Sequence, residues 1–419
     1  MDTSEPAKQK TNEIRGQQGV RRPVDPTRHH RESGWDYRGR AIYHFTLPVE
    51  ERCPLFGVLE GESAETAFVR LNPFGRRVYQ MLCGLPQFYA AKGFALKVLA
   101  QKVMPDHIHL VIQVLEPLPQ SIGAVVRGFK SACTKVYKQD YYGSGENAAG
   151  MQGRESQPGQ LGSAAGLQGG ESQPDQPGSA AGVQGRVLVH FARIFASRGS
   201  IWEQNPAYYH ERILHAPGQL RRMIDYVKDN PRRLWLKSRH PDLFRLHRRT
   251  EAAGLLFTSL GNQFLLSQPE GQVVEISRSA SSTQIQERLR AALAAAHNGA
   301  VTYTAAISEG EKLIARTLRE QGYPLVVLLN DGFPREGSPH ERFYKLGGVY
   351  FEACSQGRLL LLEPAGQSFL DAGIRASAEA TLRRKAEVRH WTYTPVPVTS
   401  QRYRFVALNE MAKRLTQGE

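Results

Sequence analysis

Short apolar segments alternate with longer helical segments over residues 41–139. The apolar segments 41–49, 94–104 and 107–114 are typical of strands, and Pro105-Asp106 between the last two predicts a hairpin. Residues 72–91, with Asn72 as N-cap and Pro73 at the first helical position, and the basic segment 120–139 predict helices. This β-α-β-β-α order indicates an antiparallel sheet with helices on one face, which is the α+β class.

A second pattern begins near residue 250. Residues 217–230 predict a helix that Pro231 ends. Beyond residue 250, helical segments alternate with nearly continuous apolar strands such as "YPLVVLLN" and "RLLLLEP". Strands of that kind are buried on both faces, so the alternation predicts a doubly wound parallel sheet. We therefore expect a second, doubly wound α/β domain over residues 250–419.

Two segments do not have the composition of a folded domain. Residues 1–32 have no apolar core, which predicts a disordered basic tail and not a secretory signal. Residues 143–187 are rich in Gly, Ser, Gln and Ala, and their Ala pairs begin at Ala148, Ala164 and Ala180, 16 residues apart. Almost no apolar residues are present for such repeats to stack, so we predict a flexible insert.

The charge of the chain changes the expected partner. A net charge of +14 and a pI of about 9.7 favour a polyanion, either nucleic acid or an anionic membrane surface. No apolar run approaches the ~20 residues that span a bilayer. The four cysteines lie far apart without CxxC spacing, which disfavours a zinc site or a disulfide framework and fits a reducing cytoplasm.

Two histidines lie one residue apart in "MPDHIHLVI". In a strand, His107 and His109 share one face with Val111 and Gln113, while the intervening apolar residues face the core. Two neutral imidazoles on one pleat are close enough to share a divalent metal. Surface or core histidines remain an alternative, because a His-x-His pair alone is weak evidence for a metal site.

The flanking residues resemble the His-hydrophobe-His (HUH) motif of the single-tyrosine HUH transposases, in particular the REP-associated tyrosine transposases. Further similar segments are "YHFTL", "CPLFG", "VRGFKSACTKVY" and "YYHERILHAPGQLRRMIDYVKDNPRRLWLK". The resemblance covers roughly residues 34–249. It implies one ferredoxin-like HUH domain over residues 33–249, within which 143–187 is a loop.

The resemblance also implies an activity. In that family a tyrosine attacks single-stranded DNA that carries a hairpin, with Mg²⁺ or Mn²⁺, and forms a 5′-phosphotyrosine link. Alignment on Arg212-Ile213-Leu214 places Tyr209 at the nucleophile position, with Tyr208 as the alternative. Glu211 is the expected third metal ligand beside His107 and His109, and His210 is the other candidate. Family members occur as monomers and as homodimers, so the resemblance does not decide the oligomeric state.

Basic residues on two predicted helices are candidates to contact the DNA backbone: Arg127, Lys130, Arg221, Arg222, Lys228, Arg232 and Arg233. Solvated helix faces are the alternative explanation of these charges. The alternative function is a non-catalytic nucleic-acid-binding protein derived from the same fold. Either function predicts a cytoplasmic, nucleoid-associated protein of bacterial type.

Residues 250–419 resemble, more weakly, the Rossmann-like fold of DNA-processing-protein relatives, and imply an accessory domain. The expected ligand end of its sheet carries Ser308, Glu309, Gly310 and the loop Asn330, Asp331 and Gly332. A helix that begins near Ser308 could hold a phosphate. The alternative is that Ser308 and Glu311 form a capping box.

Overall fold

The computed structural model describes residues 32, 34–142, 191–204, 210–336 and 346–417. The predicted insert and all but the last residue of the predicted tail therefore lie outside the described residues. The chain divides into two compact units, Asp25–Trp235 and a second made mainly of Leu236–Glu419. The division falls inside helix α5 (Gln219–Arg239), whereas the sequence placed the change of domain at residue 250.

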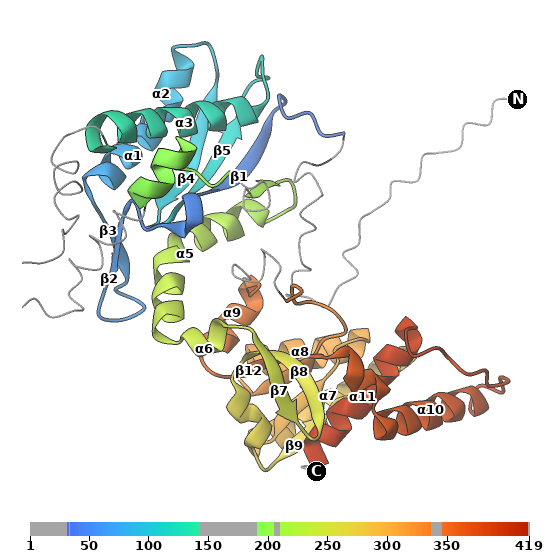
Figure 1. Ribbon diagram of the computed structural model, residues 1–419. Coiled ribbons are helices and arrows are strands. Elements are labelled where there is room, and N and C mark those ends of the chain that lie inside the picture. Colours follow the sequence, from blue (N-terminus) through green and yellow to red (C-terminus); the bar gives the residue numbers. More distant parts are fainter. Residues whose placement is uncertain (1–31, 33, 143–190, 205–209, 337–345, 418–419) are drawn as a thin grey trace, which may run out of the picture. The chain divides into compact units, whose positions relative to one another are not determined.

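The first unit is built on a four-stranded antiparallel sheet with the order β4-β5-β1-β6 (Figure 1). Its strands are β1 (Ala41–Pro48), β4 (Leu96–Val103), β5 (His107–Val114) and β6 (His210–Ile213). Helices α1 (Pro73–Cys83), α2 (Leu85–Ala90) and α3 (Ile122–Val136) complete the unit. Together these elements have the split β-α-β order of ferredoxin-like folds, so the predicted α+β class is confirmed.

One face of this sheet forms the main core. Ile108, Leu110 and Ile112 of β5 are fully buried in one cluster with side chains of α1 and α3. Asn72 caps α1, as predicted, because its side chain accepts a hydrogen bond of 2.8 Å from the Gly75 N–H. The predicted single helix 72–91 divides at Gly84 into α1 and α2. A small hairpin of β2 (Gly57–Glu60) and β3 (Phe68–Leu71) precedes α1.

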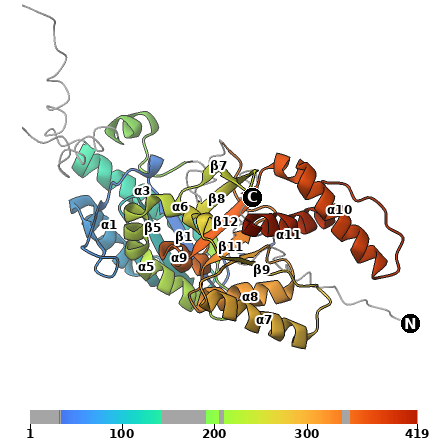
Figure 2. The ribbon, with the colours of Figure 1, turned by 90° about the horizontal axis from the view of Figure 1, so that it is seen from below.

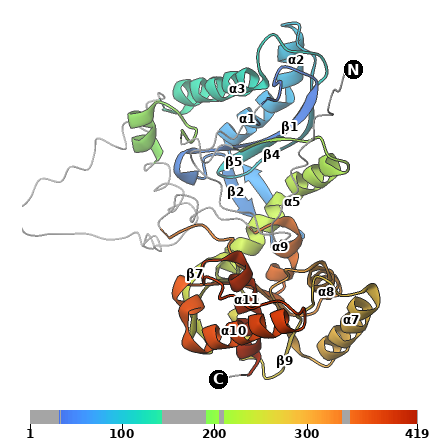
Figure 3. The same cartoon turned by 90° about the vertical axis from the view of Figure 1, so that its right-hand side faces the viewer.

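Helix α5 covers the other face of the sheet (Figure 3). Met223 and Val227 of α5 are buried against Val111 of β5. The predicted end at Pro231 is wrong, because α5 continues through this proline to Arg239. Proline lacks the N–H that would bond the Val227 carbonyl one turn earlier, and the Asn230 side chain donates a hydrogen bond of 2.7 Å to the neighbouring Tyr226 carbonyl. Burial of Asn230 and Pro231 in the packed unit compensates the weakened helix.

The second unit contains a six-stranded sheet with the order β7-β8-β12-β11-β10-β9. Strands β9 (Gly271–Val273), β10 (Val301–Thr304), β11 (Leu325–Leu328) and β12 (Leu359–Pro364) are parallel, as the apolar runs predicted. Strands β7 (His247–Ala252) and β8 (Leu255–Gly261) extend the sheet in antiparallel pairing. The four parallel strands follow one another in chain order, so their order does not reverse within the described sheet.

Helices cover both faces of this sheet, as Figure 2 shows. Helices α7 (Ser282–His297), α8 (Glu309–Glu320) and α9 (Gly348–Ser355) lie on one face. Helices α10 (Ala372–Glu387) and α11 (Gln401–Gln417) lie on the other, and the short α6 (Pro241–Phe244) precedes β7. In the part of the chain that the structure describes, no helix is both long and apolar enough to cross a bilayer.

Candidate active site

The histidine pair lies on β5 beneath α5, on the sheet face opposite the main core. His107 and His109 are 7% and 1% exposed, so both rings are withdrawn from bulk solvent. Their rings meet edge to face, and the two Nε2 atoms are 3.1 Å apart. The strand therefore presents two imidazole nitrogens to nearly the same point.

The Nδ1 atom of each ring contacts a polar side chain that restrains the ring. His107 Nδ1 lies 2.5 Å from an Asp106 carboxylate oxygen, and Asp106 also accepts from Arg52 at 3.4 Å. His109 Nδ1 lies 3.2 Å from the Thr46 hydroxyl and 3.1 Å from His44 Nε2. When Nδ1–H donates to these acceptors, each Nε2 carries a lone pair, which is the arrangement of metal-ligating histidines with a supporting hydrogen bond.

The spacing of the two nitrogens tests whether one metal ion fits. For bonds of about 2.1 Å, two ligands at right angles lie roughly 3.0 Å apart. The Nε2 separation of 3.1 Å meets this distance requirement. Across the described residues, no group of three or more His, Cys, Asp or Glu side chains is arranged to hold a metal. The pair thus fits as two ligands, and any third must be of another type or lie elsewhere.

Tyr226 of α5 packs directly onto the histidines. Its ring centroid is 5.4 Å from that of His109 and 6.5 Å from that of His44, both in edge contacts. The Arg233 guanidinium lies 5.4 Å from the same aromatic ring. Tyr226 is thus a half-buried tyrosine beside two candidate metal ligands, which makes it a candidate nucleophile.

Asn230 lies one turn beyond Tyr226 on the face of α5 that is directed at the sheet. Its side chain is buried, and its amide nitrogen donates to the Tyr226 carbonyl. The amide oxygen is thereby the remaining acceptor of this side chain. Asn230 thus places an amide oxygen, a possible metal ligand, one turn from Tyr226 on the buried face of α5.

The structure does not bring the other predicted nucleophiles and the predicted third ligand to the histidine pair within the residues that it describes. Tyr208 and Tyr209 lie outside the described residues. Glu211 is on β6 and pairs with Phe45, which belongs to the main core. Directly paired residues point to the same side of a sheet, so Glu211 lies on the opposite face from His107 and His109. Consistently, the pKa of Tyr43 on that face is raised mainly by burial and further by the Glu211 charge.

The basic residues do not form one groove. Helix α3, with Arg127 and Lys130, packs on the main-core face, while α5 packs on the histidine face. Burial lowers the pKa of Lys130. On α5, Arg221, Arg222 and Lys228 are exposed. Asp229 binds both Arg232 and Arg233, at 2.6 and 2.7 Å, so these two cations are partly neutralised.

The expected ligand end of the second sheet is closed by the chain's own carboxylates. Ser308 and Glu311 form the capping box, and Glu311 is 2% exposed. The Glu311 carboxylate accepts from the N–H groups of Ile276, Ile307 and Ser308 at 3.0, 2.6 and 3.1 Å. Ser308 and Glu311 therefore serve the start of α8 and the adjoining backbone, so the capping explanation fits the structure.

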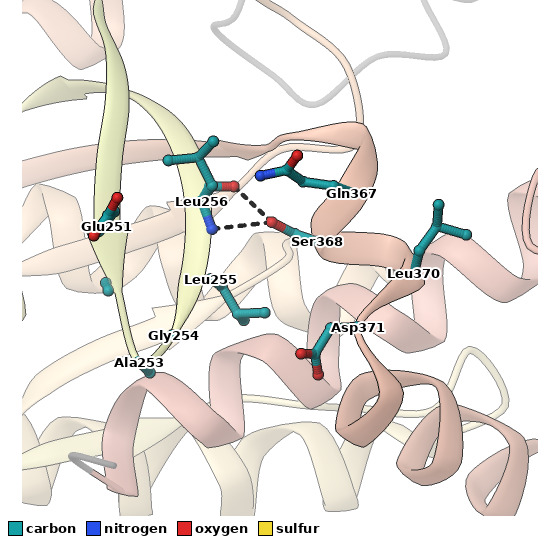
Figure 4. A pocket seen from close by; sticks show the side chains of 10 residues that line it. Glu251, Ala253, Gly254, Leu255, Leu256, Gln367, Ser368, Leu370 and Asp371 are labelled. Carbon is teal, nitrogen blue, oxygen red and sulfur yellow. Dashed lines mark hydrogen bonds between the residues drawn. The ribbon is translucent and has the colours of Figure 1, made fainter.

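A carboxylate of the chain also binds the backbone beside the loop at Asn330, Asp331 and Gly332. The Glu363 carboxylate accepts a hydrogen bond of 2.8 Å from the N–H of Phe333, which follows this loop, and burial raises the pKa of Glu363. A cavity of about 610 Å³ lies instead at the β7–β8 turn (Figure 4). In its wall, the Ser368 hydroxyl bonds both the N–H and the carbonyl of Leu256, so this side chain serves the backbone of β8.

Sequence reasoning missed His44 and Tyr226, although both left a signal. In "AIYHFTLPV", Tyr43 and Phe45 alternate with His44, so His44 had to lie on the non-core face that also carries the histidine pair. Tyr226 lies between Met223 and Val227 on an amphipathic helix whose apolar stripe needed a sheet to cover.

Comparison with known proteins leaves the family open. No protein-family profile matches the chain. No curated protein matches it either. A solved structure described as a "putative transposase" from Deinococcus radiodurans is similar at 13% identity and a TM-score of 0.21, and the match covers 48% of this chain and 96% of that one. A TM-score this low does not establish a common fold.

Proposed function

We propose that residues 25–235 form a metal-dependent, HUH-type endonuclease and strand transferase for single-stranded DNA, a transposase-like activity, with Tyr226 as the nucleophile. The observation that carries the proposal is the contact of the Tyr226 ring with His109, 5.4 Å between centroids, where His109 and His107 converge through their Nε2 atoms. Tyr226 takes the role that the sequence assigned to Tyr209 or Tyr208.

The reaction is an exchange of phosphate esters. The Tyr226 phenolic oxygen attacks a backbone phosphorus, an oxygen–phosphorus bond forms, and the bond to the 3′ oxygen breaks. The phenol releases one proton and the 3′ oxygen takes one up, so the products are a 5′-phosphotyrosine and a free 3′-OH. The phosphodiester energy is retained in the new ester, so the reverse attack by a 3′-OH completes strand transfer without another energy source.

His107 and His109 are the residues that would hold Mg²⁺ or Mn²⁺, and Asn230 is proposed to add an amide oxygen from α5. When bound, the ion offsets negative charge that develops on the attacked phosphate. Asp106 and Thr46 have a separate role, because their contacts with the Nδ1 atoms restrain the orientation of the two rings. The Arg233 guanidinium lies 5.4 Å from the centre of the Tyr226 ring, so it is a candidate to contact the DNA backbone beside the proposed nucleophile.

The DNA partner is proposed to be a single strand with a hairpin. A single strand is the form in which the backbone can reach a recessed phenol, and the exposed cations Arg221, Arg222 and Lys228 lie on the helix that carries it. Contacts of this kind neutralise phosphates, so binding should weaken steeply with salt.

The test is formation of a covalent adduct. Hairpin-bearing single-stranded DNA is incubated with protein and Mn²⁺, and a denaturing gel is examined for labelled DNA retained on protein. Tyr226→Phe should abolish the adduct, whereas Tyr79→Phe, at an exposed tyrosine of α1, should leave it intact. Loss of the adduct with Tyr209→Phe or Tyr208→Phe, but not with Tyr226→Phe, would overturn the assignment of the nucleophile.

A binding protein without turnover is the second candidate. The observation that favours it is that the described residues hold no set of three His, Cys, Asp or Glu side chains arranged for a metal. For this function, wild-type protein binds the same DNA with or without Mn²⁺ and yields no adduct under any metal condition.

A further inference from the structure

An aromatic and basic surface projects from the second unit where α10 ends. Trp391 is 58% exposed, and Val388, three residues before it, is 76% exposed. Around them are the exposed cations Arg383, Arg384, Lys385 and Arg389. We name residues 383–393 the α10 platform. Figures 1 and 2 show α10 and the loop after it extending away from the sheet of their own unit.

The backbone of the α10 platform is fixed, so Trp391 is held in place. The Trp391 N–H donates to the Ala386 carbonyl at 2.9 Å, which is the long-range bond of a Schellman helix end. His390 occupies the left-handed position of that turn with φ of 54°, where glycine is the usual residue.

Cations flank the aromatic rings. The Arg389 guanidinium lies 5.0 Å from the Trp391 ring, and that of Arg383 lies 4.8 Å from the Tyr393 ring. Arg383 is also oriented by Glu379 at 2.7 Å, and Lys385 by Glu275 at 3.4 Å. Within residues 383–393, Glu387 is the single carboxylate against four cations. The surface therefore combines π faces for bases with positive charge for phosphates.

We infer that the α10 platform binds single-stranded nucleic acid by stacking a base on Trp391 while Arg384 and Arg389 contact the backbone. Base–aromatic stacking beside a basic surface is how non-specific single-strand binders work. A polyanion pairs with Arg384 and Arg389 as it covers the indole, whereas an apolar protein surface would desolvate these two charges without pairing them. This inference concerns the second unit and does not depend on the proposed cleavage.

The experiment uses the full chain, a short oligothymidine without a hairpin, and EDTA, so that the proposed cleavage chemistry is silent. Stacking should quench part of the tryptophan fluorescence, and the Trp391→Phe variant should lose that part. In fluorescence anisotropy, Trp391→Ala should weaken binding by about 5-fold or more, with Trp391→Phe in between. Arg384→Gln and Arg389→Gln should each reduce the salt dependence of binding, since each removes a phosphate contact.

The matched control is Phe264→Ala, at a 78% exposed aromatic residue of the same unit outside the α10 platform, which should change neither signal. Equal affinity and equal quenching in wild type and Trp391→Ala would overturn the inference. So would sedimentation that shows wild type as a dimer and Trp391→Ala as a monomer, because a second copy would then be the occupant. Failure of adduct formation in the first unit would leave these measurements unaffected.

Discussion

The orientation of His109 is set by two side chains of β1, and their removal is a direct test of the metal site. His44 and Thr46 approach His109 Nδ1 at 3.1 and 3.2 Å. We expect the variant His44→Ala, Thr46→Val to free the ring to rotate, so that Nε2 no longer stays 3.1 Å from its counterpart on His107. Binding of the ion would then also have to fix the orientation of the His109 ring, which lowers the metal affinity.

The size of the effect depends on which hydrogen-bond partners of His109 each variant removes. Removing the supporting hydrogen bonds of a ligating histidine typically costs 10- to 100-fold in metal affinity, or about 1.4–2.7 kcal/mol. His44→Ala alone leaves the Thr46 hydroxyl in place, so it should fall near the lower end. The double variant removes both partners and should fall near the upper end.

The assay is Mn²⁺ binding to the DNA-free protein, measured by calorimetry or by the free-ion electron paramagnetic resonance signal. Thr46→Ser keeps a hydroxyl and should bind Mn²⁺ as the wild type does. His215→Ala, at an exposed histidine of the same unit, controls for the loss of an imidazole. Unchanged Mn²⁺ affinity in the folded double variant, with wild type binding the ion, would refute the idea that these two side chains organise the site.

Three further predictions concern stability and reactivity. Gly75→Ala should lower the free energy of unfolding by about 3 kcal/mol in urea titrations, because an added Cβ would lie 1.9 Å from the Phe56 carbonyl oxygen; an unchanged midpoint would contradict this packing. Glu311→Ala should lower the free energy of unfolding by about 3 kcal/mol in the same measurement, since two buried N–H groups and one partly buried N–H group lose their acceptor. An effect below about 1 kcal/mol would argue against the capping role. In iodoacetamide labelling followed by mass spectrometry, exposed Cys83 should react in the native protein, whereas Cys53, Cys133 and Cys354 should react only after unfolding. Burial raises the pKa of Cys53 to about 11 and that of Cys354 to about 12, and it also raises the pKa of Cys133. Modification of any of these three thiols before unfolding would contradict their burial.

Local patterns predicted most of the fold because each depends on residues close in sequence. The alternation in "HIHLVIQV" determined which side chains of β5 face the core, and Asn72-Pro73 marked the start of α1. The continuous apolar runs of β11 and β12 predicted parallel strands buried on both faces. In each case the pattern depends only on the residues of one helix or strand and on the surface against which that element packs.

The candidate site was harder to predict because it joins residues from three separate elements. Only strand register shows that Thr46 lies opposite His109 and that Glu211 faces the core. Only the packing of α5 on the sheet brings Tyr226 to His109. The local preference of Pro231 predicted a helix end, but burial in the packed unit outweighed that preference and α5 continues past it.

The most direct test of the proposed activity is to locate the DNA on the protein. After adduct formation with Mn²⁺ and nuclease trimming, trypsin separates the candidates, because Tyr226 falls in the peptide 223–228 and Tyr208 and Tyr209 fall together in 199–212. Mass spectrometry should find the nucleotide mass on Tyr226 in the 223–228 peptide. A nucleotide on the 199–212 peptide, or no modified peptide from a protein that binds the DNA, would contradict the account.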